Sequence, residues 1–240
     1  MITESTVFRP AHERFHSQLD WLDSWHSFSF SNHWDPAWVG FGPIRVINDD
    51  TIAAGRGFGM HPHQDMEIVT VMVEGELTHT DSMGHSEVLR AGEVQRMSAG
   101  TGIIHSEMNH SNQPCRLLQI WIEPQQAGIP PAYDQRSFVI HRDWTPLISI
   151  EPGKNTMSIA RRLQLYRAQP QPGDTISLPK LSDNHQWLQV IDGTFELRNA
   201  DNSIQVLKRG DGIGFTATES AAHQLVSTSK DADILMFSQL

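Results

Sequence analysis

The sequence is poor in features that mark several large classes of protein. Of its 240 residues only Cys115 is a cysteine, so an internal disulfide is excluded and a reducing compartment is expected. No apolar run has the length of a membrane span, and the N-terminus has neither the charged nor the apolar region of a secretion signal. We therefore expect a cytoplasmic protein with no membrane contact, in which Cys115 is buried and inert.

Basic residues are also scarce. The chain has 18 Lys and Arg against 28 Asp and Glu, a formal net charge of -10, and no block of basic residues. A nucleic-acid backbone is therefore not expected as a direct ligand. The hydrophobic content of 38% is enough for one large core or two smaller ones.

Long helical periodicity is missing, whereas strand signals are frequent. Runs such as 68–73 (IVTVMV) and 117–122 (LLQIWI) are separated by Glu-Gly, Met-Gly and Ala-Gly turns. This pattern predicts an all-β sandwich or barrel with a few short helices. One aromatic series is expected to pack against the sheet, with one or two of its rings lining a pocket: Trp21, Trp25, Phe28, Phe30, Trp34 and Trp38.

The two halves of the chain resemble each other at a constant offset of 118 residues. At this offset 74–77 (EGEL) falls on 192–195 (DGTF), and 87–93 (EVLRAGE) falls on 205–211 (QVLKRGD). His105 falls on His223. A register that holds at three separated places without a gap predicts a duplicated β domain.

The copies differ in their potential metal ligands. At the same offset His61 becomes Pro179, His63 becomes Leu181 and Glu107 becomes Leu225, which leaves His223 as a lone imidazole. We predict an N-terminal metal-binding domain over 1–130 and a C-terminal degenerate domain over 131–240, which is structural or acts as a wall or regulator of the first. The turn-rich stretch from about 124 to 153 is predicted to link them.

The potential metal ligands are concentrated in two short segments. His61 and His63 lie two residues apart at the start of a predicted strand, and His105 and Glu107 repeat this spacing. On regular strands each pair points to one face, so three imidazoles and one carboxylate can meet at one divalent metal. Glu67 has the same parity as His61 and His63, and it competes with Glu107 as the carboxylate ligand.

These segments resemble the two motifs of the cupin family. Residues 55–75 are similar to its first motif and 92–109 to its second, so the chain looks like a bicupin. A finer resemblance is to the pirin family, specifically to bacterial members with flavonol dioxygenase activity. It rests on 21–30 (WLDSWHSFSF), 45–50 (RVINDD), 61–63 (HPH) and 100–107 (GTGIIHSE).

The resemblance implies two cupin domains of the jelly-roll or β-barrel type. It implies His61, His63, His105 and Glu107 as metal ligands and favours Glu107 over Glu67, which is then expected to orient a ligating imidazole. One divalent transition metal is expected, with Fe(II) favoured and Mn, Co, Ni, Cu or Zn also compatible with these donors.

The resemblance also implies the reaction, in which quercetin is converted with dioxygen to a depside and carbon monoxide. The expected partners are a flavonol-like aromatic substrate and dioxygen, and Glu107 is the candidate proton acceptor. A monomer is expected. Two alternatives are a redox-responsive metal-binding regulator of transcription or metabolic partners, and a metal-dependent isomerase or ligand-storing cupin.

Several other polar residues are predicted to have structural positions without a role in the site. His79, His85 and His110 are predicted to face water, and the first two flank a turn at 81–84. Asp49 and Asp50 are predicted at a turn or strand end.

Overall fold

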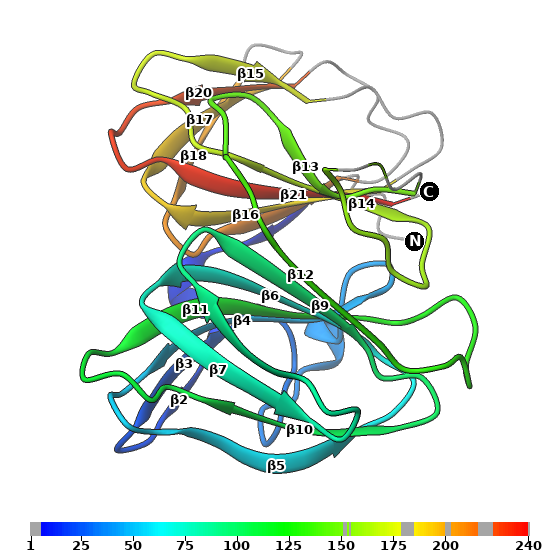
Figure 1. The fold of residues 1–240 in the computed structure, drawn as a ribbon. Coiled ribbons are helices and arrows are strands. Elements are labelled where there is room, and N and C mark those ends of the chain that lie inside the picture. Colours follow the sequence, from blue (N-terminus) through cyan, green and yellow to red (C-terminus); the bar gives the residue numbers. More distant parts are fainter. Residues whose placement is uncertain are drawn as a thin grey trace. The chain divides into compact units, whose positions relative to one another are not determined.

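The computed structural model divides into two compact units (Figure 1). The N-terminal unit contains Arg14–Phe138 and Ile159–Arg161, and the C-terminal unit contains Met1–Glu13, Val139–Ser158 and Arg162–Leu240. The structure describes residues 6–150, 153, 155–178, 185–199, 203–215 and 223–239.

The N-terminal unit is built from two antiparallel sheets. The larger sheet has the strand order β12 (Ala132–Ser137), β9 (Glu93–Ser98), β6 (Glu67–Glu74), β11 (Cys115–Ile122), β4 (Ile44–Ile52), β3 (Leu22–His26) and β2 (Phe15–Gln18). The smaller sheet has the order β5 (Gly57–His63), β10 (Ile103–Met108), β7 (Glu76–Asp81) and β8 (Ser86–Arg90).

The hydrophobic core of this unit joins side chains from both sheets. Met72 and Leu117 of the larger sheet pack in one buried cluster with Leu77 and Leu89 of the smaller sheet. Burial alternates along β7 and β10, so every second side chain of these strands points inward, as expected for a sheet with one buried face. The interior of the unit therefore lies between its two sheets.

The C-terminal unit repeats this arrangement. Its larger sheet has the order β1 (Thr6–Arg9), β19 (Gly212–Phe215), β16 (Gln186–Asp192), β21 (Asp233–Gln239), β14 (Leu163–Ala168) and β13 (Thr145–Ile148). Its smaller sheet has the order β15 (Thr175–Ser177), β20 (Gln224–Ser227), β17 (Thr194–Arg198) and β18 (Ile204–Lys208).

The predicted duplication is confirmed by strand positions and by topology. Strands β8 and β18 begin and end 118 residues apart, and the order β5-β10-β7-β8 recurs as β15-β20-β17-β18. In the larger sheets the order β9-β6-β11-β4 recurs as β19-β16-β21-β14. Leu225, at the position of Glu107, is buried in an apolar cluster, whereas Pro179 and Leu181 lie outside the described residues.

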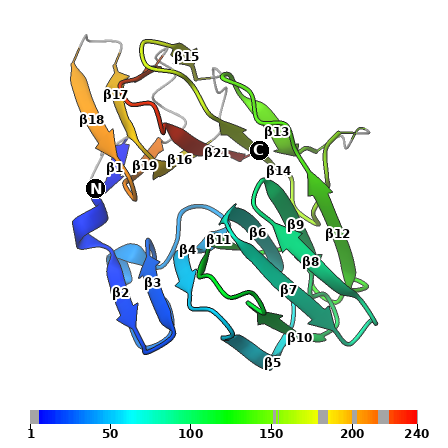
Figure 2. The same ribbon diagram turned by 60° about the vertical axis from the view of Figure 1, so that its left-hand side comes forward.

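The division into units differs from the predicted boundary after residue 130 in two places. Strand β12 pairs with β9 in the N-terminal unit, and strand β1 pairs with β19 in the C-terminal unit (Figure 2). Each added strand covers an edge that would otherwise leave backbone N–H and C=O groups unpaired. The stretch 124–153 is consequently more than a linker, since it includes both β12 and β13.

The all-β class with short helices is confirmed. The described helices are two 3-10 turns, η1 (Ala11–Glu13) and η2 (Pro36–Trp38), the second of which has a Pro at its start and is capped by Asp35. Across the described ranges, no helix combines the length and the apolar character that crossing a membrane requires. Cys115 is buried in β11, and burial raises the pKa of its thiol to about 11.

Candidate metal centre

Three adjacent strands of the smaller N-terminal sheet bring polar side chains into the interior. Strand β10 lies between β5 and β7, with His105 opposite His61 on one side and opposite Asp81 on the other. Ile103 pairs with His63, and a bulge separates His105 from Glu107 in the pairing with β5. The two-residue spacing read in the sequence therefore aims side chains inward from neighbouring strands.

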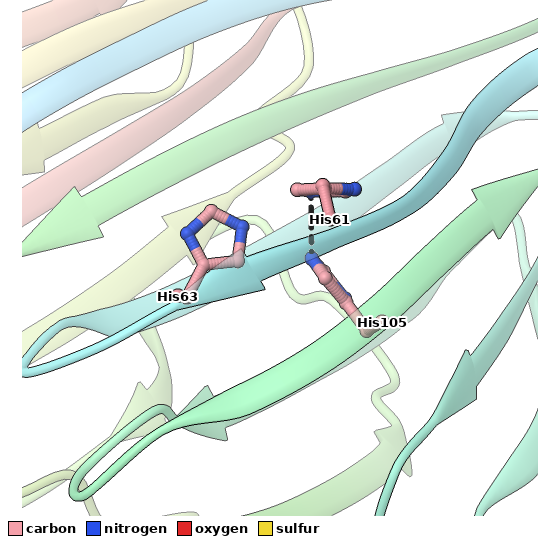
Figure 3. Close-up of side chains that lie close together, drawn as sticks. All are labelled: His61, His63 and His105. Carbon is pink, nitrogen blue, oxygen red and sulfur yellow. Dashed lines mark hydrogen bonds between the residues drawn. The ribbon is translucent and has the colours of Figure 1, made fainter.

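The structure brings His61, His63 and His105 together (Figure 3). One ring nitrogen from each of the three lies within 4.8 Å of the others. The ring centroids of His61 and His63 are 4.9 Å apart, and those of His61 and His105 are 4.4 Å apart. His105 is fully buried and the other two rings are half-buried, so the group is open on one side.

The geometry of this group fits a metal ion. Nδ1 of His61 lies 2.7 Å from the carbonyl oxygen of Gly59, which can only accept, so this nitrogen carries the proton and Nε2 of the neutral ring has a free lone pair. That Nε2 lies 3.0 Å from Nε2 of His105. Two nitrogens that each bind one ion at about 2.1 Å, with an angle of about 90° between them, are about 3.0 Å apart.

Burial keeps the imidazoles of His63 and His105 neutral. It lowers the pKa of His63 to about 4, with a further contribution from neighbouring His61. It also lowers the pKa of His105 to about 2, again with contributions from the surrounding histidines. Neutral imidazole is the form that binds metals, so these two donors do not have to lose protons at neutral pH.

Glu107 lies beside this group but is not one of its three members. Its carboxylate oxygen falls within 4.8 Å of ring nitrogens of His79 and His105, in a second fully buried group. Gln119 donates to Oε2 of Glu107 over 2.7 Å, and Thr70 lies 3.5 Å from Oε1. Burial raises the pKa of Glu107, and the hydrogen bond from Gln119 opposes that rise.

Glu67 lies on a different sheet from the histidines. Strand β5 ends at His63, the backbone turns through Asp65 with a φ of 48°, and Glu67 starts β6 in the larger sheet. Ser98 donates to its Oε2 over 2.8 Å, and the backbone N–H of Ala160 also donates to it. The parity argument that placed Glu67 beside His61 and His63 fails because the strand does not continue through the turn.

A cavity of about 410 Å³ adjoins the histidines. His61, His63 and Glu107 line it. Four aromatic side chains line it as well: Trp21, Phe30, Phe58 and Trp121. Trp21 and Phe30 belong to the N-terminal aromatic series, of which one or two rings were expected to line a pocket. The ring of Trp121 stands edge-on to His63 with centroids 5.0 Å apart. This size and lining are typical of a small-molecule site.

The cavity also has a polar wall that the sequence interpretation missed. Nδ1 of His26 lies 2.8 Å from Oδ1 of Asn48, Nε2 of His26 lies 2.9 Å from Oγ of Ser17, and Ser24 donates to Asp50. The prediction that Asp50 lies at a turn or strand end is wrong, because it points into the cavity from within β4. The Asn-Asp-Asp run gave no periodicity signal, because buried positions in β4 do not alternate.

The buried carboxyl group of Asp50 is expected to make the free energy of unfolding depend on pH. Burial raises its pKa from 3.8 to about 7, so the folded state holds this proton more tightly than the unfolded state does. The resulting stabilisation is complete below pH 3.8 and is lost as the pH rises through about 7. Relative to an Asp50→Asn variant, the metal-free protein is expected to lose about 4 kcal/mol of unfolding free energy between these limits.

Urea denaturation of both proteins at a series of pH values measures this difference. A Ser24→Ala variant serves as a control, because it keeps the buried carboxyl group and removes a hydrogen bond that lowers the pKa of Asp50, so its pH dependence should be at least as large as that of the unchanged protein. Parallel stability curves for Asp50→Asn and the unchanged protein would contradict the expectation.

Three further histidine predictions have different outcomes. His79 was predicted to face water but is buried, because the inward alternation of β7 includes it; the prediction was wrong. The side chain of His85 is 38% exposed and His110 is exposed, as predicted. His223 is buried in the C-terminal unit, where its ring stacks on Phe215 and its Nδ1 lies 3.0 Å from Oδ1 of Asn199.

Among its described residues, the C-terminal unit shows no comparable centre. Within the ranges that the structure describes, both groups of three ligand-type side chains lie in the N-terminal unit.

Comparison with known protein families gives matches over both units. A model of the Pirin family matches residues 7–122. A model described as the quercetinase C-terminal cupin domain matches residues 147–238.

Individual relatives match over nearly the whole chain. A quercetin 2,3-dioxygenase of Escherichia coli O157:H7 is 40% identical over 230 residues, covering 95% of this chain and 96% of the relative. The crystal structure of the bacterial pirin YhhW from Escherichia coli in complex with nickel(II) superposes with a TM-score of 0.90 at 39% identity, covering 98% of both chains. A quercetin 2,3-dioxygenase from Acinetobacter baumannii shares the fold, with a TM-score of 0.77 at 18% identity, covering 98% of this chain and 79% of the other.

Proposed function

We propose that this chain, which belongs to the pirin family, is a metal-dependent dioxygenase that cleaves a flavonol such as quercetin to a depside with release of carbon monoxide. The observation that carries the proposal is the convergence of His61, His63 and His105 beside an aromatic-lined cavity. A cavity of this size in contact with the histidines favours an enzyme over a regulatory metal protein. The names of the relatives support the reaction class.

His61, His63 and His105 would hold the metal, with Glu107 as the fourth ligand. The donor set accepts several divalent ions, and we propose Fe(II) as the working metal. When bound, the metal supplies Lewis acidity and, for a redox-active ion, one-electron chemistry with dioxygen.

The protein's own side chains bind the substrate and move a proton. The faces and edges of Trp121 and Phe30 can hold a flat ring system in the cavity. Glu107 is the proposed proton acceptor for an enolic hydroxyl, because burial favours its protonated form and Gln119 holds its carboxylate in place. Glu107 is only 2% exposed, so bulk water has little access to the atoms of this transfer.

Oxygen consumption tests the proposed reaction. Purified protein loaded in turn with Fe(II), Mn(II), Co(II), Ni(II) or Cu(II) is mixed with quercetin, and dioxygen uptake, loss of flavonol absorbance and carbon monoxide release are followed together. We expect all three signals with at least one metal and none with the metal-free protein. Absence of turnover with every metal would overturn the proposal.

Paired glutamine variants test the assignment of the carboxylate. Glu107→Gln removes the proton acceptor and is expected to lower turnover by about 100-fold or more, with weaker metal binding. Glu67→Gln is the matched control, since its carboxylate is bonded to Ser98 away from the histidines, and it should keep both properties. Loss of bound metal in Glu67→Gln alone would reverse the assignment.

A further inference from the structure

The geometry points to His79 and Asp81 as positioning residues that fix the proton of His105 on Nδ1 and so leave its Nε2 free for the metal. This inference rests on the proposed metal site and concerns two residues outside its ligand set. It can be tested in the metal-free protein, independently of the proposed reaction.

A continuous chain of polar contacts leads away from His105. Nδ1 of His105 lies 3.3 Å from Nδ1 of His79, and Nε2 of His79 lies 3.0 Å from Oδ2 of Asp81. The side chains of His79 and Asp81 are 1% and 0% exposed. Water therefore does not compete for these contacts, and each proton position determines the next.

The carboxylate of Asp81 determines which nitrogen donates at each contact in this chain of contacts. Burial opposes ionisation of Asp81, but hydrogen bonds from His79, from His85 and from the turn outweigh it and lower the pKa of Asp81. A carboxylate only accepts, so Nε2 of neutral His79 carries the proton and its Nδ1 is an acceptor. Nδ1 of His105 must then be the donor, which leaves a lone pair on Nε2 of His105.

Nε2 of His105 is the nitrogen that faces His61. The carbonyl of Gly59 fixes His61 in the same tautomer, so two lone pairs point toward each other across 3.0 Å. Such an arrangement is repulsive unless a cation lies between the nitrogens. A backbone carbonyl on one side and a buried Asp-His pair on the other therefore prepare the two rings for one ion.

Asp81, at the outer end of this chain of contacts, is held in place by the turn after β7. Oδ1 of Asp81 accepts from the backbone N–H groups of Met83, over 2.9 Å, and His85, over 3.1 Å. Nδ1 of His85 lies 2.9 Å from Oδ2. The ring of Tyr133 stacks on both His79 and His85.

This turn makes Asp81→Asn a selective probe. The two backbone donors require an oxygen at the Oδ1 position, so the new amide group must occupy the Oδ2 position and donate toward Nε2 of His79. His79 would then carry its proton on Nδ1 and oppose the Nδ1 proton of His105. His105 is driven to the other tautomer, in which Nε2 is protonated and cannot bind a metal.

Nitrogen NMR of the metal-free, 15N-labelled protein reads the tautomer directly. In the unchanged protein, Nδ1 of His105 and Nε2 of His79 are expected to have the shifts of protonated nitrogens, and Nε2 of His105 that of an unprotonated one. In Asp81→Asn the assignments of both rings should exchange. A protonated Nε2 on His105 in the unchanged protein would overturn the inference, whatever the enzymatic activity.

Calorimetric titration with Ni(II) gives a second, independent readout. Asp81→Asn is expected to bind roughly 10–100-fold more weakly than the unchanged protein, and His79→Phe, which keeps the ring stacking on Tyr133, should weaken binding as well. His110→Phe is the control, because it replaces an exposed imidazole that is not a member of this chain of contacts, and its affinity should be unchanged. Equal affinity in all four proteins would overturn the inference.

Discussion

Replacing His63 by glutamine is expected to weaken Ni(II) binding by more than the roughly 10–100-fold that loss of a residue supporting a ligand costs. Nitrogens of three rings converge within 4.8 Å, and the variant leaves two of them. Metal-dependent oxygen uptake with quercetin should fall to the level of the metal-free protein. Calorimetry with Ni(II) and an oxygen electrode measure the two effects.

A surface histidine supplies the control. His110 is exposed, and His110→Gln should leave metal affinity and oxygen uptake unchanged. The expectation fails if His63→Gln binds Ni(II) as tightly as the control while circular dichroism shows both proteins folded.

Removing the carboxylate of Asp233 is expected to destabilise the C-terminal unit by about 3–5 kcal/mol. Nε and Nη2 of Arg167 donate to the two carboxylate oxygens of Asp233 over 2.9 and 2.6 Å, and the side chains are only 4% and 8% exposed. Asp233→Ala leaves the guanidinium group buried without its counter-charge. Urea denaturation followed by tryptophan fluorescence measures the loss, because Trp187 is buried in this unit.

A double variant separates a desolvated charge from a general packing defect. Arg167→Met with Asp233→Leu replaces both charges by apolar groups and should recover most of the stability that Asp233→Ala loses. If the double variant is as unstable as Asp233→Ala, lost volume rather than an uncompensated charge explains the effect.

The same ion pair occurs in the N-terminal unit with its charges exchanged between strands. There Asp49 of β4 pairs with Arg116 of β11, whereas Arg167 of β14 pairs with Asp233 of β21. At the 118-residue offset Asp49 falls on Arg167. The prediction that Asp49 lies at a turn or strand end was wrong, because Asp49 lies within β4. The sequence around it gives no indication that its carboxylate meets an arginine 67 residues away.

The sequence predicted most of the fold because its strongest signals are local or repeated. Turn glycines and β-rich runs indicated the strands, and the constant offset indicated the duplication without any knowledge of which strands pair. The order of the smaller sheet, β5-β10-β7-β8, was not readable, since pairing between distant strands depends on contacts that no local periodicity encodes.

By itself, the sequence determined that His61, His63, His105 and Glu107 share a spacing of two residues, which on strands aims each pair to one side. Only the tertiary structure decided where these pairs meet. It placed β10 between β5 and β7, which brings His105 to His61 and buries His79 and Asp81 behind it, and it moved Glu67 to another sheet. The physical reason is that side-chain alternation is a property of one strand, whereas strand pairing and burial depend on the packing of the whole unit.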